Sequence, residues 1–184
     1  MNKEIEAFRD GIFALRTRRF GNVAELMIQK LFKLTDSKRL EFDKYDSKTN
    51  NKIEVKFSTV MKKNQATIKS DNLIEECLNA NVANRAIELK DIDKYNFDCN
   101  IQQIKIVEFD ILYYGLFFAD KILIFKINST QIKHANIGYS DKQHRNNKGE
   151  GQFHITNENF KYHYDNFFVK EITYKKLYNL FKKF

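Results

Sequence analysis

Two acidic side chains and a lysine lie close together in a short alternating stretch of the sequence. Glu54 and Lys56 stand two positions apart in residues 52–58, whose polar and apolar residues alternate as in a β-strand. Their side chains therefore project from one face, about 6.6 Å apart. Asp43 belongs to an earlier alternating run, residues 40–45, and a polar turn would fold the two runs into a β-hairpin. An antiparallel pairing would bring Asp43 beside Glu54 and Lys56.

This set of side chains suits metal-dependent hydrolysis of phosphodiester bonds. Mg²⁺ prefers carboxylate oxygens and is usually held by one or two carboxylates, with water and phosphate oxygens completing its shell. Asp43 and Glu54 are the candidate magnesium ligands, joined by the backbone carbonyl of Val55 if the strand bends toward the cation. Lys56 is the candidate for positioning or activating the attacking water. Strand register is not fixed by alternation alone, so Asp46 stays an alternative to Asp43 as the first acid.

The same residues carry a family resemblance. Asp43 followed by Glu54-Val55-Lys56 resembles the D…(D/E)-x-K motif of the PD-(D/E)XK nuclease superfamily, which includes many type II restriction endonucleases. Phe42 stands where the family name has proline, which is among the most variable parts of the motif. The resemblance implies an α/β fold with a restriction-endonuclease-like core, in which a mixed central β-sheet is flanked by helices. It also implies hydrolysis of DNA with Mg²⁺ as cofactor.

A further acidic residue precedes the motif on an expected helix. Glu25 shares one stripe of that helix with Ile28 and Phe32, so it is expected to point inward or into a cleft. In the resembled family an acidic residue on a helix before the motif often supports the metal site, and Glu25 matches that placement. The alternative is a glutamate at the rim that pairs with Lys or Arg.

Length and composition predict one soluble domain with a basic surface. The 184 residues suffice for a single core, and 42% hydrophobic with 14% aromatic residues provide the apolar area for it. No apolar run is long enough to cross a bilayer and the first residues lack a signal-peptide core, so we expect a cytoplasmic protein without membrane contact. The net charge of +8 favours a polyanionic partner.

Apolar periodicity predicts the elements around the hairpin. Two helices are expected within residues 1–35, at 4–15 and 22–34, with Gly21 breaking or bending the chain between them. A helix from residue 71 or 72 to about 89 is expected to cover one face of the sheet. The central strands beyond the hairpin at residues 40–58 are expected at 101–107, 109–118 and 121–128. A last helix within residues 173–184, capped by Thr173, has an apolar stripe that fits either the core or a dimer surface.

Two groups of polar side chains are candidates for contacting DNA. The loop expected at residues 138–155 is rich in amide, guanidinium and other polar side chains of the kind that hydrogen-bond to base edges. They are Gln143, His144, Arg145, Asn146, Asn147, Lys148 and Gln152. Gln103 and Lys105 are expected on one face of the strand at 101–107, where they would extend the active-site face toward a phosphate. The alternative for both groups is an ordinary solvent-exposed surface.

These observations predict a Mg²⁺-dependent endonuclease that acts on double-stranded DNA. The preferred form is a type II restriction endonuclease, part of a restriction-modification system, that cuts a short specific sequence as a homodimer. A structure-selective nuclease, such as a junction resolvase or a repair nuclease, would share the same metal site. A non-catalytic nucleic-acid-binding module, in which the hairpin charges are incidental, is the alternative from another class.

Overall fold

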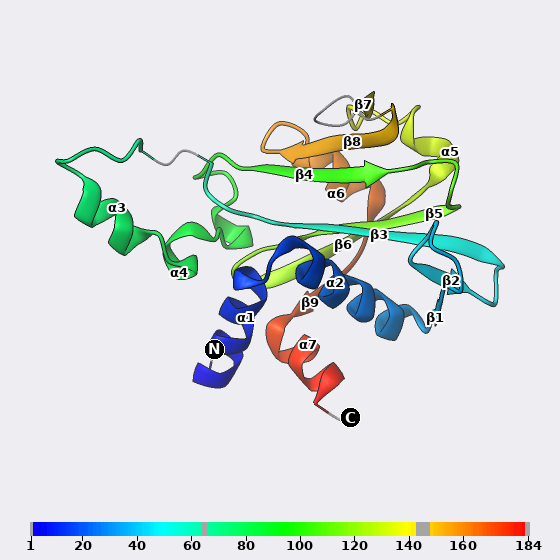
Figure 1. The fold of residues 1–184 in the computed structure, drawn as a ribbon, viewed down its shortest axis with the longest axis horizontal. Coiled ribbons are helices and arrows are strands. Elements are labelled where there is room, and N and C mark those ends of the chain that lie inside the picture. The colour runs from blue at the N-terminus through cyan, green and yellow to red at the C-terminus, as the bar shows by residue number, and fades with distance from the viewer. Residues whose placement is uncertain (1, 64–65, 143–147, 183–184) are drawn as a thin grey trace.

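The strands form a large and a small sheet. A computed structural model describes residues 2–63, 66–142 and 148–182. The large sheet has six strands in the order β1-β2-β3-β5-β6-β9 (Figure 1). In chain order these are β1 (Thr35–Asp36), β2 (Lys44–Asp46), β3 (Asn51–Thr59), β5 (Ile111–Phe117), β6 (Lys121–Asn128) and β9 (Phe168–Thr173). Strands β3 and β5 are parallel and the other pairs are antiparallel, so the predicted mixed central sheet is confirmed.

The small sheet and the helices complete the fold. The small sheet has the order β4-β8-β7, formed by β4 (Asp98–Ile104), β8 (Lys148–Thr156) and β7 (Ser140–Lys142). The helices are α1 (Lys3–Ala14), α2 (Thr17–Phe32), α3 (Leu73–Asn79), α4 (Val82–Arg85), α5 (Ser129–Ile132), α6 (Phe160–Phe167) and α7 (Tyr174–Phe181), with a 3-10 turn at Leu89–Asp91. No helix in the described ranges has the length and apolar composition required to cross a bilayer.

The large sheet lies between two layers, each with its own core. Helices α1, α2 and α7 cover one face, and the small sheet with α6 covers the other (Figure 1). Met27 and Ile28 of α2 pack on the helix side, whereas Ile101 and Phe153 of the small sheet pack on the opposite side. Because both faces are covered, every residue of β5 is buried. The predicted flanking of the sheet by helices is confirmed.

Strand β3 distributes its side chains as its alternation predicts. Ile53 and Val55 are buried against the helices, and Phe57 packs on the same cluster. Glu54 and Lys56 therefore project from the opposite face, toward the small sheet. Its parallel pairing with β5 fixes the register from Ile53, opposite Ile111, to Thr59, opposite Phe117. The strand thus holds two charged groups at the boundary between the two sheets.

The first strand of the hairpin is shorter than predicted. We expected it to begin at Leu40, but β2 spans only Lys44–Asp46 and pairs with the start of β3. Leu40 is fully exposed and has no core to pack against, so the alternation that begins there leads to no strand pairing. Asp43 consequently precedes β2, although its backbone N–H still donates to the carbonyl of Ile53 at 3.1 Å.

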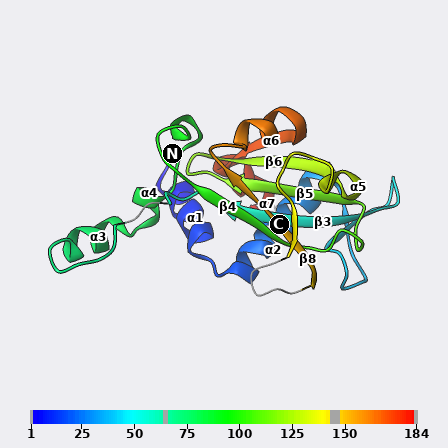
Figure 2. The ribbon, with the colours of Figure 1, turned by 90° about the horizontal axis from the view of Figure 1, so that it is seen from above.

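The prediction of one helix from residue 71 or 72 to about 89 is also wrong. That segment contains α3, α4 and the 3-10 turn, and Asn81 starts α4 by accepting a hydrogen bond from the backbone of Asn84. Leu73, Ile74 and Leu78 were expected in the core and are exposed instead. Helix α3 projects away from both sheets in two perpendicular views (Figures 1 and 2). It therefore covers no face of the large sheet.

Two further elements differ from the prediction. The strand expected at residues 101–107 is β4, which belongs to the small sheet and ends at Ile104. The segment 138–155 is not one loop, since it contains β7 and most of β8; these two strands pair with each other, and β8 also pairs with β4. Its polar residues alternate with the buried residues Gly151, Phe153 and Ile155, and this alternation is the strand signal that its glycine content obscured.

The terminal helices follow the prediction closely. Helices α1 and α2 occupy the expected N-terminal region, but the prediction that Gly21 separates them is wrong, because α1 gives way to α2 at Leu15 and Arg16, and Gly21 lies inside α2. The last helix, α7, begins after Thr173, whose side chain accepts a hydrogen bond from the backbone N–H of Lys176. Leu177 is fully buried in the core on the helix side, so part of the apolar stripe of α7 serves the core.

Candidate active site

Asp43, Glu54 and Lys56 converge at one place on the edge of β3. The Nζ of Lys56 lies 3.5 Å from Oδ2 of Asp43 and contacts Oε1 of Glu54. Glu54 is only 7% exposed, and its second oxygen, Oε2, is buried without a hydrogen-bond partner among the described residues. The arrangement predicted from the sequence spacing, in which two acids and one amine share a small volume, is present.

The backbone of β3 holds Asp43 in position. The N–H of Val55 donates to Oδ2 of Asp43 at 2.9 Å. This bond forms where β2 has not yet begun, so a side-chain carboxylate takes the place of a backbone acceptor. Both backbone groups of a strand residue point to the same edge of the strand, so the carbonyl of Val55 faces the edge where Asp43 lies.

Asp46 does not share this site. Its carboxylate accepts hydrogen bonds from the backbone N–H of Lys48 at 3.0 Å and from the hydroxyl of Thr49 at 2.8 Å. These bonds stabilise the turn between β2 and β3. Of the two aspartates, the geometry therefore places Asp43 and not Asp46 beside Lys56.

Burial and charge act in opposite directions on the ionisable groups of the site. Burial, with a further contribution from the negative charge of Asp43, raises the pKa of Glu54 to about 7 even though Lys56 opposes the shift. Burial by itself would lower the pKa of Lys56, but the charges of Glu54 and Asp43 outweigh it and raise that pKa. The site therefore favours a charged lysine beside a glutamate that can take up a proton near neutral pH.

Glu25 lies on the wall of the same site. Its Oε2 is 3.7 Å from Nζ of Lys44, a buried lysine that also binds Asp36 at 2.7 Å. Burial raises the pKa of Glu25 and the nearby charge of Asp43 adds to the effect, while Lys44 opposes it. Glu25 therefore pairs with a lysine, as the alternative expectation had it, and its carboxylate also interacts electrostatically with Asp43 at the site.

A cleft of about 670 Å³ opens in front of these groups. Asp43, Lys56 and Glu25 line it together with the basic side chains Arg18 and Arg39. Its remaining polar lining comes from α2, from the segment before β2 and from β4, and consists of Thr17, Asn22, Ser37, Asn100, Gln102 and Gln103. Sequence reasoning did not identify Arg39, Asn100 or Gln102. For the last two, the alternation with the buried residues Cys99 and Ile101 was the available signal.

The residues predicted to contact DNA fall into three groups. Gln143, His144, Arg145, Asn146 and Asn147 lie outside the described residues. Lys148 and Gln152 belong to β8, and the side chain of Gln152 accepts a hydrogen bond from Asn100 at 3.0 Å.

Gln103 and Lys105 form the third group and do not share a strand face as predicted. Gln103 has φ of 61°, and the strand pairing is irregular between Gln102 and Ile104. Lys105 lies beyond the end of β4, where its Nζ is 3.5 Å from Glu108. Gln103 lines the cleft and Lys105 does not.

The described residues contain no group of three or more His, Cys, Asp or Glu side chains that could hold a metal ion.

No protein-family model matches the sequence, and no curated protein or solved structure matches the chain. The case for a function therefore depends on the geometry of the site.

Proposed function

We propose that this protein hydrolyses DNA phosphodiester bonds with Mg²⁺ as cofactor. The observation that carries the proposal is the position of Lys56, whose amine lies 3.5 Å from Asp43 and contacts Glu54 at a cleft that Arg18 and Arg39 also line. An amine between two carboxylates, beside a cleft that can admit a polyanion, is the set of groups that this hydrolysis needs. The motif Asp43…Glu54-Val55-Lys56 supports the same reaction through its resemblance to PD-(D/E)XK nucleases.

The donor atoms at the site fit Mg²⁺. Oε2 of Glu54 is a buried carboxylate oxygen with no partner in the described residues, and a cation would satisfy it. Asp43 and the carbonyl of Val55 would supply further oxygen ligands, and Mg²⁺ commonly takes one or two carboxylates and keeps several waters. When bound, the ion would polarise the phosphate and acidify a bound water.

The residues of the chain have separate roles in this proposal. Lys56 orients the attacking water and offsets negative charge on the phosphate. Arg18 and Arg39, which line the cleft, contact neighbouring phosphates of the strand. Glu25 lies on the wall of the cleft and supports the site through the electrostatic interaction between its carboxylate and that of Asp43. The net charge of +8 assists binding of the polyanion.

The preferred form is a type II restriction endonuclease with a restriction-endonuclease-like core. The mixed sheet, with helices on one face and the motif at the edge of β3, supports this form. Two copies related by a two-fold axis would address both strands of a palindromic site, so we propose a homodimer. Light scattering of the protein–DNA complex tests the number of copies. A mass equal to two chains and one duplex would support the homodimer.

Incubation of plasmid DNA with and without Mg²⁺, followed by sequencing of the ends, tests the reaction. We expect cutting only with Mg²⁺ and ends at one short motif, whereas ends scattered over branched or damaged DNA would indicate a structure-selective nuclease. Glu54→Ala and Lys56→Ala should each reduce cutting by about 100-fold or more while DNA binding persists. Lys52→Ala is the matched control, because Lys52 lies on the same strand but outside the cleft. Absence of Mg²⁺-dependent cutting would refute the proposal.

One observation favours a non-catalytic DNA-binding module as the second candidate. Lys56 already contacts both carboxylates, and the described residues contribute no third acid, histidine or cysteine to a metal group. In that case the three side chains form an ion-pair network that stabilises the hairpin. The protein would then bind DNA equally well with and without Mg²⁺ and would cut none of it.

A further inference from the structure

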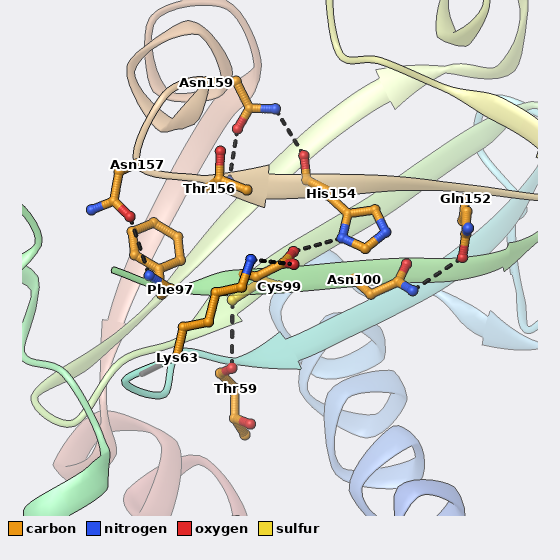
Figure 3. A network of polar contacts seen from close by, with 11 residues as sticks. Thr59, Lys63, Phe97, Cys99, Asn100, Gln152, His154, Thr156, Asn157 and Asn159 are labelled. Atoms are coloured by element: carbon orange, nitrogen blue, oxygen red, sulfur yellow. Dashed lines mark hydrogen bonds and ion pairs between the residues drawn. The ribbon is translucent and has the colours of Figure 1, made fainter. Parts of the chain in front are cut away.

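Two amide side chains pair across the outer face of the small sheet. Asn100 on β4 and Gln152 on β8 lie side by side, and Nδ2 of Asn100 donates to Oε1 of Gln152 at 3.0 Å (Figure 3). Both residues project away from the buried side chains Ile101 and Phe153, which are register partners in the same two strands. The pair therefore belongs to the polar face of the sheet and not to its core.

The pair leaves the oxygen of one amide and the amino group of the other without a hydrogen-bond partner in the described residues. Oδ1 of Asn100 is shielded from solvent and has no hydrogen-bond partner, and Nε2 of Gln152 makes no hydrogen bond within the described ranges. Exchanging oxygen and nitrogen in both amides would move the free oxygen to Gln152 and the free amino group to Asn100, so an acceptor and a donor still lie side by side. The two free groups thus form an adjacent donor and acceptor whichever way the amides are oriented.

Of the pair, Asn100 lines the cleft of the proposed site, and Gln152 lies beside Asn100 without lining it. Asn100 lines the same cleft as Asp43 and Lys56, and its neighbours Gln102 and Gln103 line it as well. The terminal torsion of an asparagine side chain is soft, but turning the shielded Oδ1 toward a ligand in the cleft also carries Nδ2 away from Gln152, so the ligand has to replace the hydrogen bond between the two amides. A duplex in the cleft would lie against β4, because residues of that strand line the cleft together with Lys56.

We propose that Asn100 and Gln152 together read an adenine in the major groove of the bound DNA. Adenine presents an N6 amino donor beside an N7 acceptor, whereas guanine presents two acceptors, cytosine a donor and thymine an acceptor with a methyl group. Oδ1 of Asn100 accepts from N6, and Nε2 of Gln152 donates to N7. The inference rests on the proposed function only in requiring that duplex DNA occupies the cleft.

A binding selection tests this assignment without requiring catalysis. The full chain is mixed with a library of duplexes carrying a randomised segment, in EDTA, and the bound duplexes are sequenced. The variants are Asn100→Leu and Gln152→Leu, which remove one amide each, and the double exchange Asn100→Gln with Gln152→Asn, which keeps a donor beside an acceptor. Thermal unfolding of each variant verifies that it is folded, and Gln152→Leu and the exchange keep the test decisive if Asn100→Leu does not fold.

We expect the wild type to enrich a motif with adenine at one fixed position. Each leucine variant should lose about tenfold or more of that preference while keeping the remaining bases of the motif, and the exchange variant should retain it. Replacing that adenine with 7-deazaadenine, which lacks N7, should weaken binding by the wild type but not by Gln152→Leu. A purely structural amide pair would change stability without changing the preferred base.

The results separate this inference from the proposed reaction. Leucine variants that enrich the same adenine as the wild type, or a wild-type motif with no adenine that depends on these two residues, would overturn the inference. The same holds if the wild type selects no motif at all. Selection of the motif without Mg²⁺-dependent cutting of a plasmid that contains it would refute the nuclease and support the base reading. Mg²⁺-dependent cutting at a motif that the leucine variants do not alter would support the nuclease and overturn the base reading.

Discussion

Lys56 and Asp43 are joined through a single oxygen, since Oδ2 of Asp43 lies 3.5 Å from the amine of Lys56 and also accepts the backbone N–H of Val55 at 2.9 Å. The carboxylate therefore has two roles, one in extending the hydrogen bonding of β3 and one in placing negative charge at the site. The two roles can be separated by the choice of substitution.

Asp43→Asn should abolish cutting while leaving the fold intact. The asparagine oxygen can still accept from Val55, but the charge that would hold a cation is lost, so we expect activity to fall by about 100-fold or more. Asp43→Ala should lose activity equally and also destabilise the protein by about 1 kcal/mol, because the N–H of Val55 loses its acceptor. Plasmid cutting and urea denaturation measure the two effects, and equal destabilisation by both substitutions would contradict this division.

Magnesium binding should become tighter as the pH rises through neutrality. Burial raises the pKa of Glu54 to about 7, and a cation requires the ionised carboxylate. We expect the affinity for Mg²⁺ to increase about tenfold between pH 6 and pH 8, with proton release at pH 6. Calorimetric titration in buffers of different ionisation enthalpy measures both, and Glu54→Gln is the control that should remove the pH dependence. An affinity for Mg²⁺ that does not change with pH would exclude Glu54 as a ligand.

His163 should make the protein sensitive to acid. It is fully buried on α6, its Nδ1 is 2.9 Å from the hydroxyl of Tyr114, and burial lowers its pKa to about 4. In the unfolded chain the pKa of a histidine is about 6.5. The stability that the neutral, buried His163 contributes is therefore complete above that pH and is lost as the pH falls toward 4.

The variant His163→Gln removes this titration. Between pH 7 and pH 4.5 the wild type should lose about 2 kcal/mol more unfolding free energy than the variant, as measured by urea denaturation. Parallel curves for the two proteins over this pH range would show that His163 does not titrate on unfolding.

Gly115 should tolerate no side chain. A Cβ at this position in β5 would collide with the backbone carbonyl of Leu123 and with the ring of Phe57. Because a carbonyl in a paired strand cannot move aside, Gly115→Ala should destabilise the protein by about 3 kcal/mol. Gly21→Ala is the matched control, since nothing lies within 4 Å of a Cβ there and alanine favours the helix. Thermal unfolding compares the two, and similar melting temperatures for both variants would contradict the packing argument.

DNA binding should weaken steeply with salt. The chain carries a net charge of +8, and Arg18 and Arg39 line the cleft. If these groups neutralise several phosphates, the logarithm of the affinity should fall linearly with the logarithm of the salt concentration, and Arg39→Gln should reduce the slope by about 1. Fluorescence anisotropy at several salt concentrations measures the slope. A salt-independent affinity would argue against a polyanionic ligand.

The sequence by itself determined the orientation of the charges on β3. Alternation of Ile53, Glu54, Val55 and Lys56 places the acid and the lysine on one face, because the side chains of any strand alternate with a period of two. The apolar patterning of residues 109–118 and 121–128 likewise predicted central strands, and β5 and β6 lie there. The same local reasoning failed at α3, where an apolar stripe gave no sign that Ile74 would have nothing to pack against.

The tertiary structure alone decided which groups meet at the site. The choice of Asp43 over Asp46 follows from the register that pairs Lys44 with Ile53, and the cleft exists because α2 and β4 both approach the edge of β3. Asn100 and Gln152 are far apart in the chain and become neighbours only through the pairing of β4 with β8. Periodicity is a property of a few consecutive residues, whereas these contacts depend on which distant surfaces bury each other, and no single segment encodes that.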